Sequence, residues 1–243
     1  MRPVTWLLAV AVCCLPVVSA LGPAHAEEPK KDAPTAEEVL HRMAKVYADF
    51  KSYRDSGIVK TVFVGGEGNW TDEKPFTTAF VRPDRFRFEY KEKMPDNQEY
   101  RYIIWAKGKN VQTWWDVKPG VEKVDSLALA LAEAHGVSDG SARTIPGLLL
   151  ADQIGAGWVM NLEGLKRIED ARLGESDFFR VQGETGIRGH GPVTLWIDKS
   201  TFLVRRIDEQ VKFEDFRIET TTIYEPEINS EIPDKKLQFD PPK

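Results

Sequence analysis

"VTLWIDKSTFLVRRIDEQ", residues 193–210, has the pattern of two β-strands joined by a turn. Apolar and polar residues alternate from residue 193 to residue 198, as in a strand with one buried face. Asp198 to Thr201 offers turn chemistry, and residues 202–207 run back as a second strand. Trp196 departs from this pattern because it shares its face with a threonine and an aspartate. The sequence therefore predicts a hairpin with large apolar groups on both faces, and strand parity leaves open which face meets the interior.

The first 26 residues have the features of a secretory signal peptide. Arg2 gives a positive N-terminal region, residues 6–18 are apolar, and Ala24-His25-Ala26 matches the small-x-small cleavage pattern. Val18-Ser19-Ala20 is a second candidate cleavage site. The apolar run is too short, and too interrupted by proline, to favour a membrane span. We expect a periplasmic protein exported by a cleavable signal peptide (1–26), with a flexible tether (27–34) and a single domain (35–243).

The cysteine content and the net charge limit the compartments and the classes of partner that we expect for this protein. Both cysteines, Cys13 and Cys14, lie in the signal segment, so the exported chain cannot form a disulfide, which suits a bacterial periplasm. Without Arg2 the 33 basic residues become 32, against 38 acidic ones, for a net charge of −6. This balance disfavours nucleic acid as a partner.

Strand patterns surround a helical middle. Thr35 and Glu38 form a capping box for a helix that continues to Phe50. Two Leu-rich helices are expected at 125–135, ended by Gly136, and at 144–154, with Thr144 as N-cap. Strands are expected at 58–64, 80–90 with an edge or bulge at Pro83, 100–106, 111–115, 165–173, 177–184, 193–198, 202–207, 211–224 and, as a short edge, 235–243. The fold class is mainly β (α+β): one antiparallel sheet with helices on one side.

Catalytic signals are scarce. His41, His135 and His190 have no metal-ligand spacing, and no nucleophile motif is present. A hydrolase that uses His190 and a carboxylate is the least favoured hypothesis. We expect no enzyme activity, no catalytic residue, no metal and no cofactor.

Tryptophan content gives the main functional signal. Trp114 and Trp115 are adjacent, so in a strand they point to opposite faces. Either layers of protein cover both faces, or one face is a ligand wall. A single curved sheet with about three helices is expected to fill its concave side incompletely, which would leave an apolar cavity.

Four ordered motifs resemble those of the LolA/LolB-like periplasmic lipoprotein carriers. "FVRPDRFRFEY" (80–90) resembles their x-R-P-x-x-F-x-[FW] strand, and "AKGKNVQTWW" (106–115) resembles their D-G-K-x-x-W-x-Y hairpin. "LWIDKSTFLVRRI" (195–207) is similar to their L-x-[IV]-D-x-x-[TG]-x-[LI]-x-[RQ] hairpin, and "LQFDPP" (237–242) to their closing F-x-F-x-P-P. The resemblance implies an unclosed antiparallel β-barrel, or strongly curved sheet, with helices that cover the concave side.

The resemblance also implies a function: a carrier that holds a lipid or an acylated lipoprotein in an apolar cavity. The two Leu-rich helices would form a lid, with Arg82 as its anchor. An envelope membrane protein is a further expected partner, and we expect a monomer. The expected ligand-binding residues are Phe86, Phe88, Tyr90, Trp105, Trp114, Trp196, Leu148 and Leu149.

The alternative is a non-enzymatic envelope sensor or interaction module of the same fold that binds a protein partner. In that case the sheet edge or the charged convex face, with Arg85, Arg87, Arg205 and Arg206, would matter more than the cavity.

Overall fold

The computed structural model describes residues 33–65, 68–94, 97–187 and 189–242. The predicted signal peptide and most of the predicted tether fall at residues 1–32, outside the described residues. From Pro34 onward the chain forms one compact unit. In the described part of the chain, no helix is long and apolar enough to cross a membrane.

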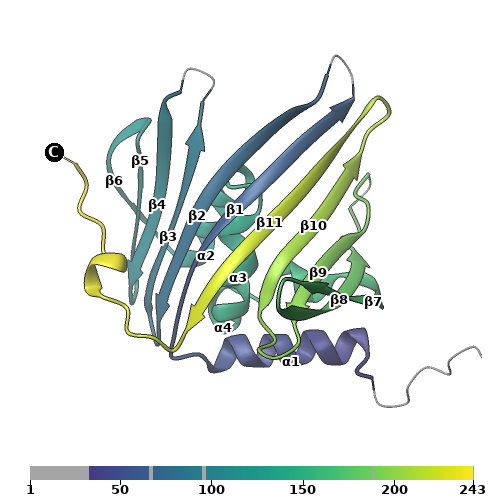
Figure 1. Cartoon of the computed structure of the whole chain (residues 1–243). Coiled ribbons are helices and arrows are strands. Elements are labelled where there is room, and N and C mark those ends of the chain that lie inside the picture. The colour runs from purple at the N-terminus through teal and green to yellow at the C-terminus, as the bar shows by residue number, and fades with distance from the viewer. Residues whose placement is uncertain (1–32, 66–67, 95–96, 188, 243) are drawn as a thin grey trace, which may run out of the picture. The chain divides into compact units, whose positions relative to one another are not determined.

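Within the described residues, eleven strands form one antiparallel sheet that does not close (Figure 1). The strands are β1 (Ser52–Gly65), β2 (Trp70–Val81), β3 (Arg85–Lys93), β4 (Glu99–Lys107), β5 (Asn110–Trp115), β6 (Lys118–Val124), β7 (Glu163–Leu173), β8 (Ser176–Glu184), β9 (Val193–Asp198), β10 (Val204–Lys212) and β11 (Phe216–Ile228). Neighbours along the chain pair as hairpins, and β1 pairs with β11 to join the two halves. The expected mainly β class and unclosed sheet are confirmed.

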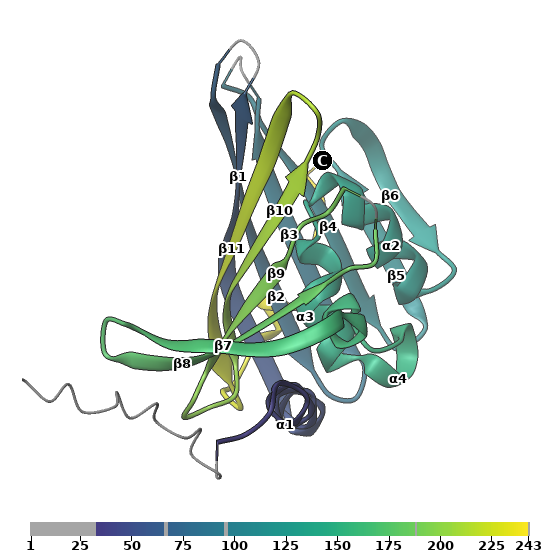
Figure 2. The same ribbon diagram turned by 90° about the vertical axis from the view of Figure 1, so that its right-hand side faces the viewer.

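The helices lie on one side of this sheet. They are α1 (Ala36–Asp49), α2 (Leu127–Val137), α3 (Ser141–Leu149) and α4 (Ala151–Ile154), with 3-10 turns at Trp158–Asn161 and Asp234–Lys236. The helices α2 and α3 lie within the curve of the sheet, and α1 crosses the end of the central strands (Figure 2). The predicted capping box starts α1: the Thr35 hydroxyl accepts from the Glu38 N–H at 3.2 Å, and the Glu38 carboxylate accepts from the Thr35 N–H at 2.9 Å.

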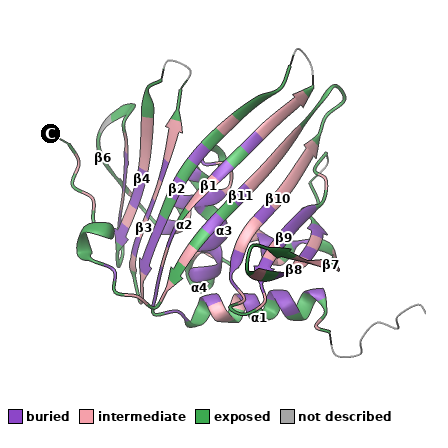
Figure 3. Ribbon diagram, viewed as in Figure 1, coloured by how far each residue is buried: buried purple, intermediate pink, exposed green. Residues whose placement is uncertain are grey.

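The core lies between the concave face and the helices. Phe86, Phe88 and Tyr90 alternate into it, while the residues between them face away, as the strand period predicts. Figure 3 shows where buried residues lie along the strands and helices. Gly57 on β1 makes room for this packing, because a Cβ there would lie 2.3 Å from the ring of Phe76. Phe76 thus packs across β1 against Tyr224, with ring centroids 5.5 Å apart.

Two segments that the sequence predicts as single strands are divided by turns. In the 80–90 segment β2 ends at Val81 and β3 begins at Arg85, so Pro83 lies in a turn rather than at a bulge within a strand. Proline has no N–H for a sheet ladder, and a turn tolerates it better. In the 211–224 segment β10 ends at Lys212 and β11 begins at Phe216. Glu214 and Asp215 lie between the two strands, and polar residues of this kind favour a turn.

The predicted boundaries of the Leu-rich helices are wrong. Gly136 lies inside α2, which begins after Ser126, whose hydroxyl accepts from the Leu129 N–H. Thr144 is inside α3 rather than its N-cap. The cap is Gly140, whose φ of 87° allows the sharp reversal between α2 and α3. The second predicted helix is also divided, since α3 ends at Leu149 and α4 follows it.

The C-terminal segment adds no strand over residues 235–242. It crosses the convex face of the sheet, where the Arg87 guanidinium donates to the carbonyl groups of Lys235 (3.4 Å) and Gln238 (2.7 Å). The tail's carbonyl groups thus bond a side chain instead of a strand edge. The predicted short edge strand at 235–243 is therefore wrong.

Candidate functional site

The concave face and the α2–α3 pair bring together five of the predicted ligand-binding residues. Phe86, Phe88 and Tyr90 come from β3, and Leu148 and Leu149 from the last turn of α3. All belong to one buried apolar cluster, and none is more than 2 % exposed. These side chains already pack in a closed interior, so a ligand could reach them only if the helix pair moved.

The three predicted tryptophans lie elsewhere, on the convex face. Trp105 pairs across the sheet with Arg87, and Trp196 pairs with Arg206, in register positions that face away from the helices. Sequence parity shows which residues share a face, but it does not show which face is covered. Trp114 likewise faces away from the helices. The structure therefore does not bring these three together with the other five.

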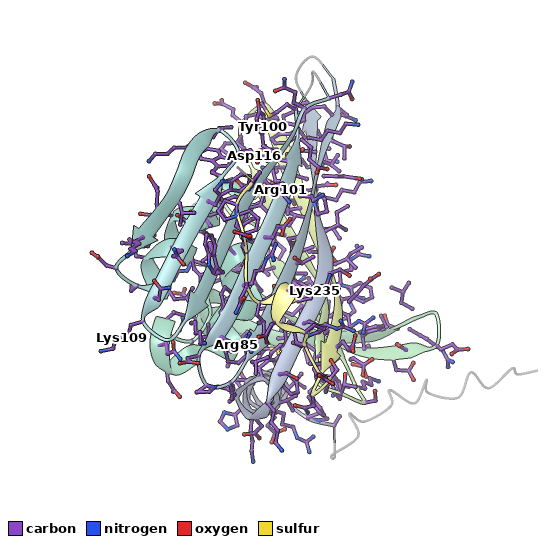
Figure 4. All side chains as sticks on the ribbon, turned by 90° about the vertical axis from the view of Figure 1, so that its left-hand side faces the viewer. Arg85, Tyr100, Arg101, Lys109, Asp116 and Lys235 are labelled. Carbon is purple, nitrogen blue, oxygen red and sulfur yellow. The ribbon has the colours of Figure 1, made fainter. Side chains whose placement is uncertain are left out.

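The C-terminal segment packs on two of the tryptophans of the convex face. Phe239 packs on Trp105 and Trp114, with ring centroids 5.4 and 5.1 Å apart. The guanidinium groups of Arg87 and Arg101 lie 5.4 and 5.8 Å from the Phe239 ring centroid. Figure 4 views this side of the molecule, where Arg101 is labelled. These contacts fix the tail on the sheet.

Polar partners surround the third convex tryptophan. The Trp196 indole N–H donates to the Asp208 carboxylate at 2.8 Å. The guanidinium groups of Arg180 and Arg206 lie 4.9 and 5.1 Å from its ring centroid. Trp196 is thus a stacked surface residue, while Val193, Leu195 and Ile197 on the other face of the same strand enter the core.

Arg82 joins three structural elements. From the turn between β2 and β3, its guanidinium donates to the carbonyl groups of Phe50 (2.7 Å), Tyr47 (3.2 Å) and Leu149 (3.1 Å). The first two carbonyls lie at the C-terminal end of α1 and the third at the end of α3. Helix C-terminal carbonyls lack intrahelical partners and favour a cation. Arg82 therefore ties the end of α3 to α1 and to the sheet.

Lys74 forms a second tie, at the opposite end of α3. Its ammonium group lies 3.2 Å from the carboxylate of Asp139, in the turn between α2 and α3. It also lies 3.5 Å from Asp72 and 3.4 Å from Glu92 on the sheet. Burial lowers the pKa of Lys74, but these three carboxylates outweigh that effect and raise it. The Thr61 hydroxyl also donates to Asp139, at 3.4 Å.

None of the site residues expected from the sequence belongs to this cluster of Lys74, Asp72, Glu92 and Asp139. Lys74 and Asp139 are separated by a long stretch of chain, and nothing local links them. The available signal was weak: Asp72 and Lys74 lie at the same parity as Phe76, on the buried face of their strand.

Two carboxyl groups on the concave side, one buried and one partly buried, have raised pKa values. Asp55 is 6 % exposed and accepts from the Tyr53 hydroxyl at 2.7 Å and the Thr78 N–H at 2.9 Å. Burial raises its pKa from 3.8 to about 6, against these hydrogen bonds. Burial also raises the pKa of Glu209 to about 7. The Tyr90 hydroxyl is buried and makes no hydrogen bond within the described residues.

Two cavities that the described residues line have walls of mixed polar and apolar character. One of about 700 Å³ lies between the convex face and the tail, where Arg54, Thr77, Glu225, Lys235 and Lys236 contribute to its walls. A second, of about 600 Å³, is lined by charged residues toward the tips of the hairpins. The predicted ligand-binding residues of β3 and α3 line neither of these two.

His190 lies exposed in the loop before β9, and its backbone bridges to Val211. The described residues contain no group of three or more His, Cys, Asp or Glu side chains placed to hold a metal ion. The hydrolase hypothesis therefore gains no support from geometry.

Neither a protein-family model nor a curated protein matches the sequence. Among solved structures, the chain is similar to a LolA superfamily protein from Nitrosomonas europaea, with 11 % identity, a TM-score of 0.35, and coverage of 85 % of this chain and 99 % of that one. It is similar to LprF from Mycobacterium bovis, with 13 % identity, a TM-score of 0.42, and coverage of 82 % and 94 %. It is also similar to the Pseudomonas aeruginosa MucA/MucB complex, with 11 % identity, a TM-score of 0.36, and coverage of 84 % of this chain and 61 % of that one.

At such identities and scores, a likeness concerns the fold alone. The architecture itself has the features that the sequence motifs imply: an antiparallel sheet that does not close, and two apolar helices within its curve. The predicted unclosed antiparallel sheet with helices on its concave side is thereby confirmed.

Proposed function

We propose that this protein is a non-enzymatic carrier that holds a lipid-like ligand between the concave face of the sheet and the α2–α3 pair. We call this pair, Leu127–Leu149, the lid. One observation carries the proposal: an apolar sheet face and an apolar helix pair close on each other, and side chains at the two ends of α3 tie them together. Arg82 holds the end of α3, and Lys74 holds the turn that carries Asp139.

An acyl chain suits this interior. Phe86, Phe88, Leu148 and Leu149 offer area without directional groups, and removal of apolar area from water contributes about 25 cal/mol per Å². A flexible chain could replace the contacts between the β3 side chains and the lid. The unpartnered Tyr90 hydroxyl could donate one hydrogen bond to a ligand carbonyl.

The proposed setting is the periplasm, where an acylated lipoprotein or a free lipid would be the ligand. An envelope membrane protein would deliver or receive it, and nucleic acid would not be a partner. The carrier would act as a monomer.

A protein partner is the second candidate function. The observation that favours it is the cavity of about 700 Å³ on the convex face. Lys235 and Lys236 line it, and within the described residues their ammonium groups form no ion pair. The cavity walls also carry Asp55, Glu89, Glu225 and Glu227, so a partner segment with charges of both signs would fit it. The MucB structure was solved in complex with MucA, but that partner is a property of MucB.

Native mass spectrometry of protein purified without detergent tests the carrier proposal. We expect part of the population to carry the added mass of a lipid. Arg82→Leu should raise the lipid-bound fraction about tenfold, because loss of three hydrogen bonds weakens the closed state that competes with the ligand.

Arg85→Leu is the matched control. Arg85 lies just after Arg82, but its guanidinium pairs with Asp234 of the tail, 2.9 Å away. It should leave the lipid-bound fraction unchanged. If no lipid mass is found on the wild-type protein or on Arg82→Leu, and added lipids do not shift thermal unfolding, the carrier proposal fails.

A further inference from the structure

Four aromatic side chains gather at the tips of the two central hairpins. Phe63 and Trp70 stack face to face across the β1–β2 hairpin, with ring centroids 3.5 Å apart. Phe213 and Phe216 stack likewise at the β10–β11 hairpin, at 4.3 Å. We call these four residues the aromatic tip surface. Trp70, Phe213 and Phe216 are 56 %, 50 % and 41 % exposed, although each could pack in a core.

The two stacked pairs form one surface. β1 and β11 are neighbours, with Gly65 opposite Phe216 and Phe63 opposite Ile218. A Cβ on Gly65 would lie 3.2 Å from that of Phe216, so the second pair adjoins the first hairpin directly. These tips extend past the helices at one end of the sheet (Figures 1 and 2).

The surface also faces the concave side. Phe63 follows Thr61 by two residues, and residues two apart share a strand face. Thr61 bonds Asp139 in the lid turn. The aromatic tip surface thus continues the concave face beyond the Lys74 cluster.

The size of the surface argues against a protein occupant. A stable protein interface takes about 20–30 residues from each side. Here the apolar surface consists of four aromatic side chains at the ends of two narrow hairpins. Two exposed ion pairs, Lys60–Glu73 and Arg217–Glu219, lie on the same strands a few residues from these ends. A second copy of the chain would find too little area for a stable dimer. A lipid bilayer imposes no such minimum, and Trp and Phe rings at its interface are favourable.

The charges near the tips favour a neutral bilayer. Lys60 and Arg217 are already paired with carboxylates, and Glu214 and Asp215 occupy the turn beside Phe213. Lys212 lies on the other side of Phe213 and is offset by these two carboxylates, so the described residues of the tips carry no surplus of cations that would attract anionic lipids. We propose that the aromatic tip surface docks the protein on the surface of a zwitterionic phospholipid bilayer, so that its concave side opens toward the lipid.

Sedimentation with phosphatidylcholine vesicles tests this inference. The wild-type protein should sediment with the vesicles, with no gain when anionic lipid is added. The triple variant Trp70→Ser/Phe213→Ser/Phe216→Ser should bind at least tenfold more weakly, since each buried aromatic side chain is worth about a factor of ten or more. The control Leu173→Ser/Ile223→Ser removes side chains that are 60 % and 43 % exposed elsewhere on the sheet, and should bind as wild type.

Wild-type protein that stays in solution, a triple variant that binds equally, or binding that requires anionic lipid would each overturn the inference. Hydrogen exchange of the wild-type protein needs no variant. Vesicles should slow exchange at 60–65, 68–74 and 210–220, and unchanged exchange there would overturn the inference as well. Neither measurement depends on whether the protein retains a lipid ligand, so this inference and the carrier proposal can fail separately.

Discussion

Among single residues, Asp55 and Glu209 are the carboxyl groups whose raised pKa makes the stability of the fold depend on pH, and Asp55 is the more buried of the two. Asp55 is 6 % exposed, and burial raises its pKa from 3.8 to about 6. Below about pH 4 the carboxyl is protonated in both the folded and the unfolded chain, so it contributes no difference. Between pH 4 and pH 6 the unfolded chain binds fewer protons than the folded one, so stability falls as the pH rises. Above pH 6 the loss is complete, at about 3 kcal/mol.

Asp55→Asn should flatten this dependence. The amide cannot ionise, and its oxygen can still accept from the Thr78 N–H. The free energy of unfolding, measured in urea at pH 4 and at pH 8, should fall less with pH in the variant than in the wild type. Exposed Asp49→Asn serves as control and should follow the wild type. Equal slopes for Asp55→Asn and wild type would contradict the assignment of a raised pKa to this group.

The positions of single aromatic residues explain why the candidate site was only partly predictable from the sequence. Alternation correctly grouped Phe86, Phe88 and Tyr90 on one face, because strand parity is a local property. It could not reveal that Trp105 and Trp114 face outward. Their cover, Phe239, lies far along the chain, and only the folded tail brings it there.

At the scale of elements, the lid depends on ties that are formed by side chains distant in sequence. Lys74 has a side chain only 10 % exposed, and it forms an ion pair with Asp139 of the lid. Lys74→Met would leave three carboxylates close together without their cation, and removal of one partner from a buried ion pair is destabilising. We expect amide exchange in 127–149 to accelerate at least tenfold, measured by hydrogen exchange with mass spectrometry.

Lys60→Met is the control for this effect. Lys60 lies on β1 near the same end of the sheet, but its pair with Glu73 is about half exposed on both sides. Exposed pairs contribute little, so exchange in the lid should not change. Equal protection of the lid in Lys74→Met and in the wild type would show that this cluster does not hold the lid.

Element boundaries were predictable where a local signal existed. The capping box of Thr35 and Glu38 placed the start of α1 correctly, because both hydrogen bonds lie within one turn. The start of α3 was missed, since Thr144 resembles an N-cap but is used inside the helix. Its hydroxyl donates to the Gly140 carbonyl and accepts from the Trp158 indole N–H. That indole comes from a later segment, which sequence alone does not place.

At the scale of the whole molecule, the two faces of the sheet have different roles. The convex face is closed by the tail and by arginines stacked on aromatic rings. The concave face is closed by the lid, which no strand pairing or disulfide fixes in the described residues. The sequence indicated an interior short of side chains. The structure instead encloses a packed interior, so under the proposed function the space for a ligand would arise when the lid moves.

The most direct test of that claim is to fix the lid closed and measure ligand binding. Cysteine occurs only at positions 13 and 14, so Thr61→Cys/Asp139→Cys would supply the only thiols in residues 27–243. The native side chains at these positions already meet, 3.4 Å apart. With a fluorescent fatty acid as probe, we predict at least tenfold weaker binding for the oxidised double variant, and full recovery after reduction. Equal binding by the oxidised and reduced forms, with the disulfide verified by mass, would contradict the account.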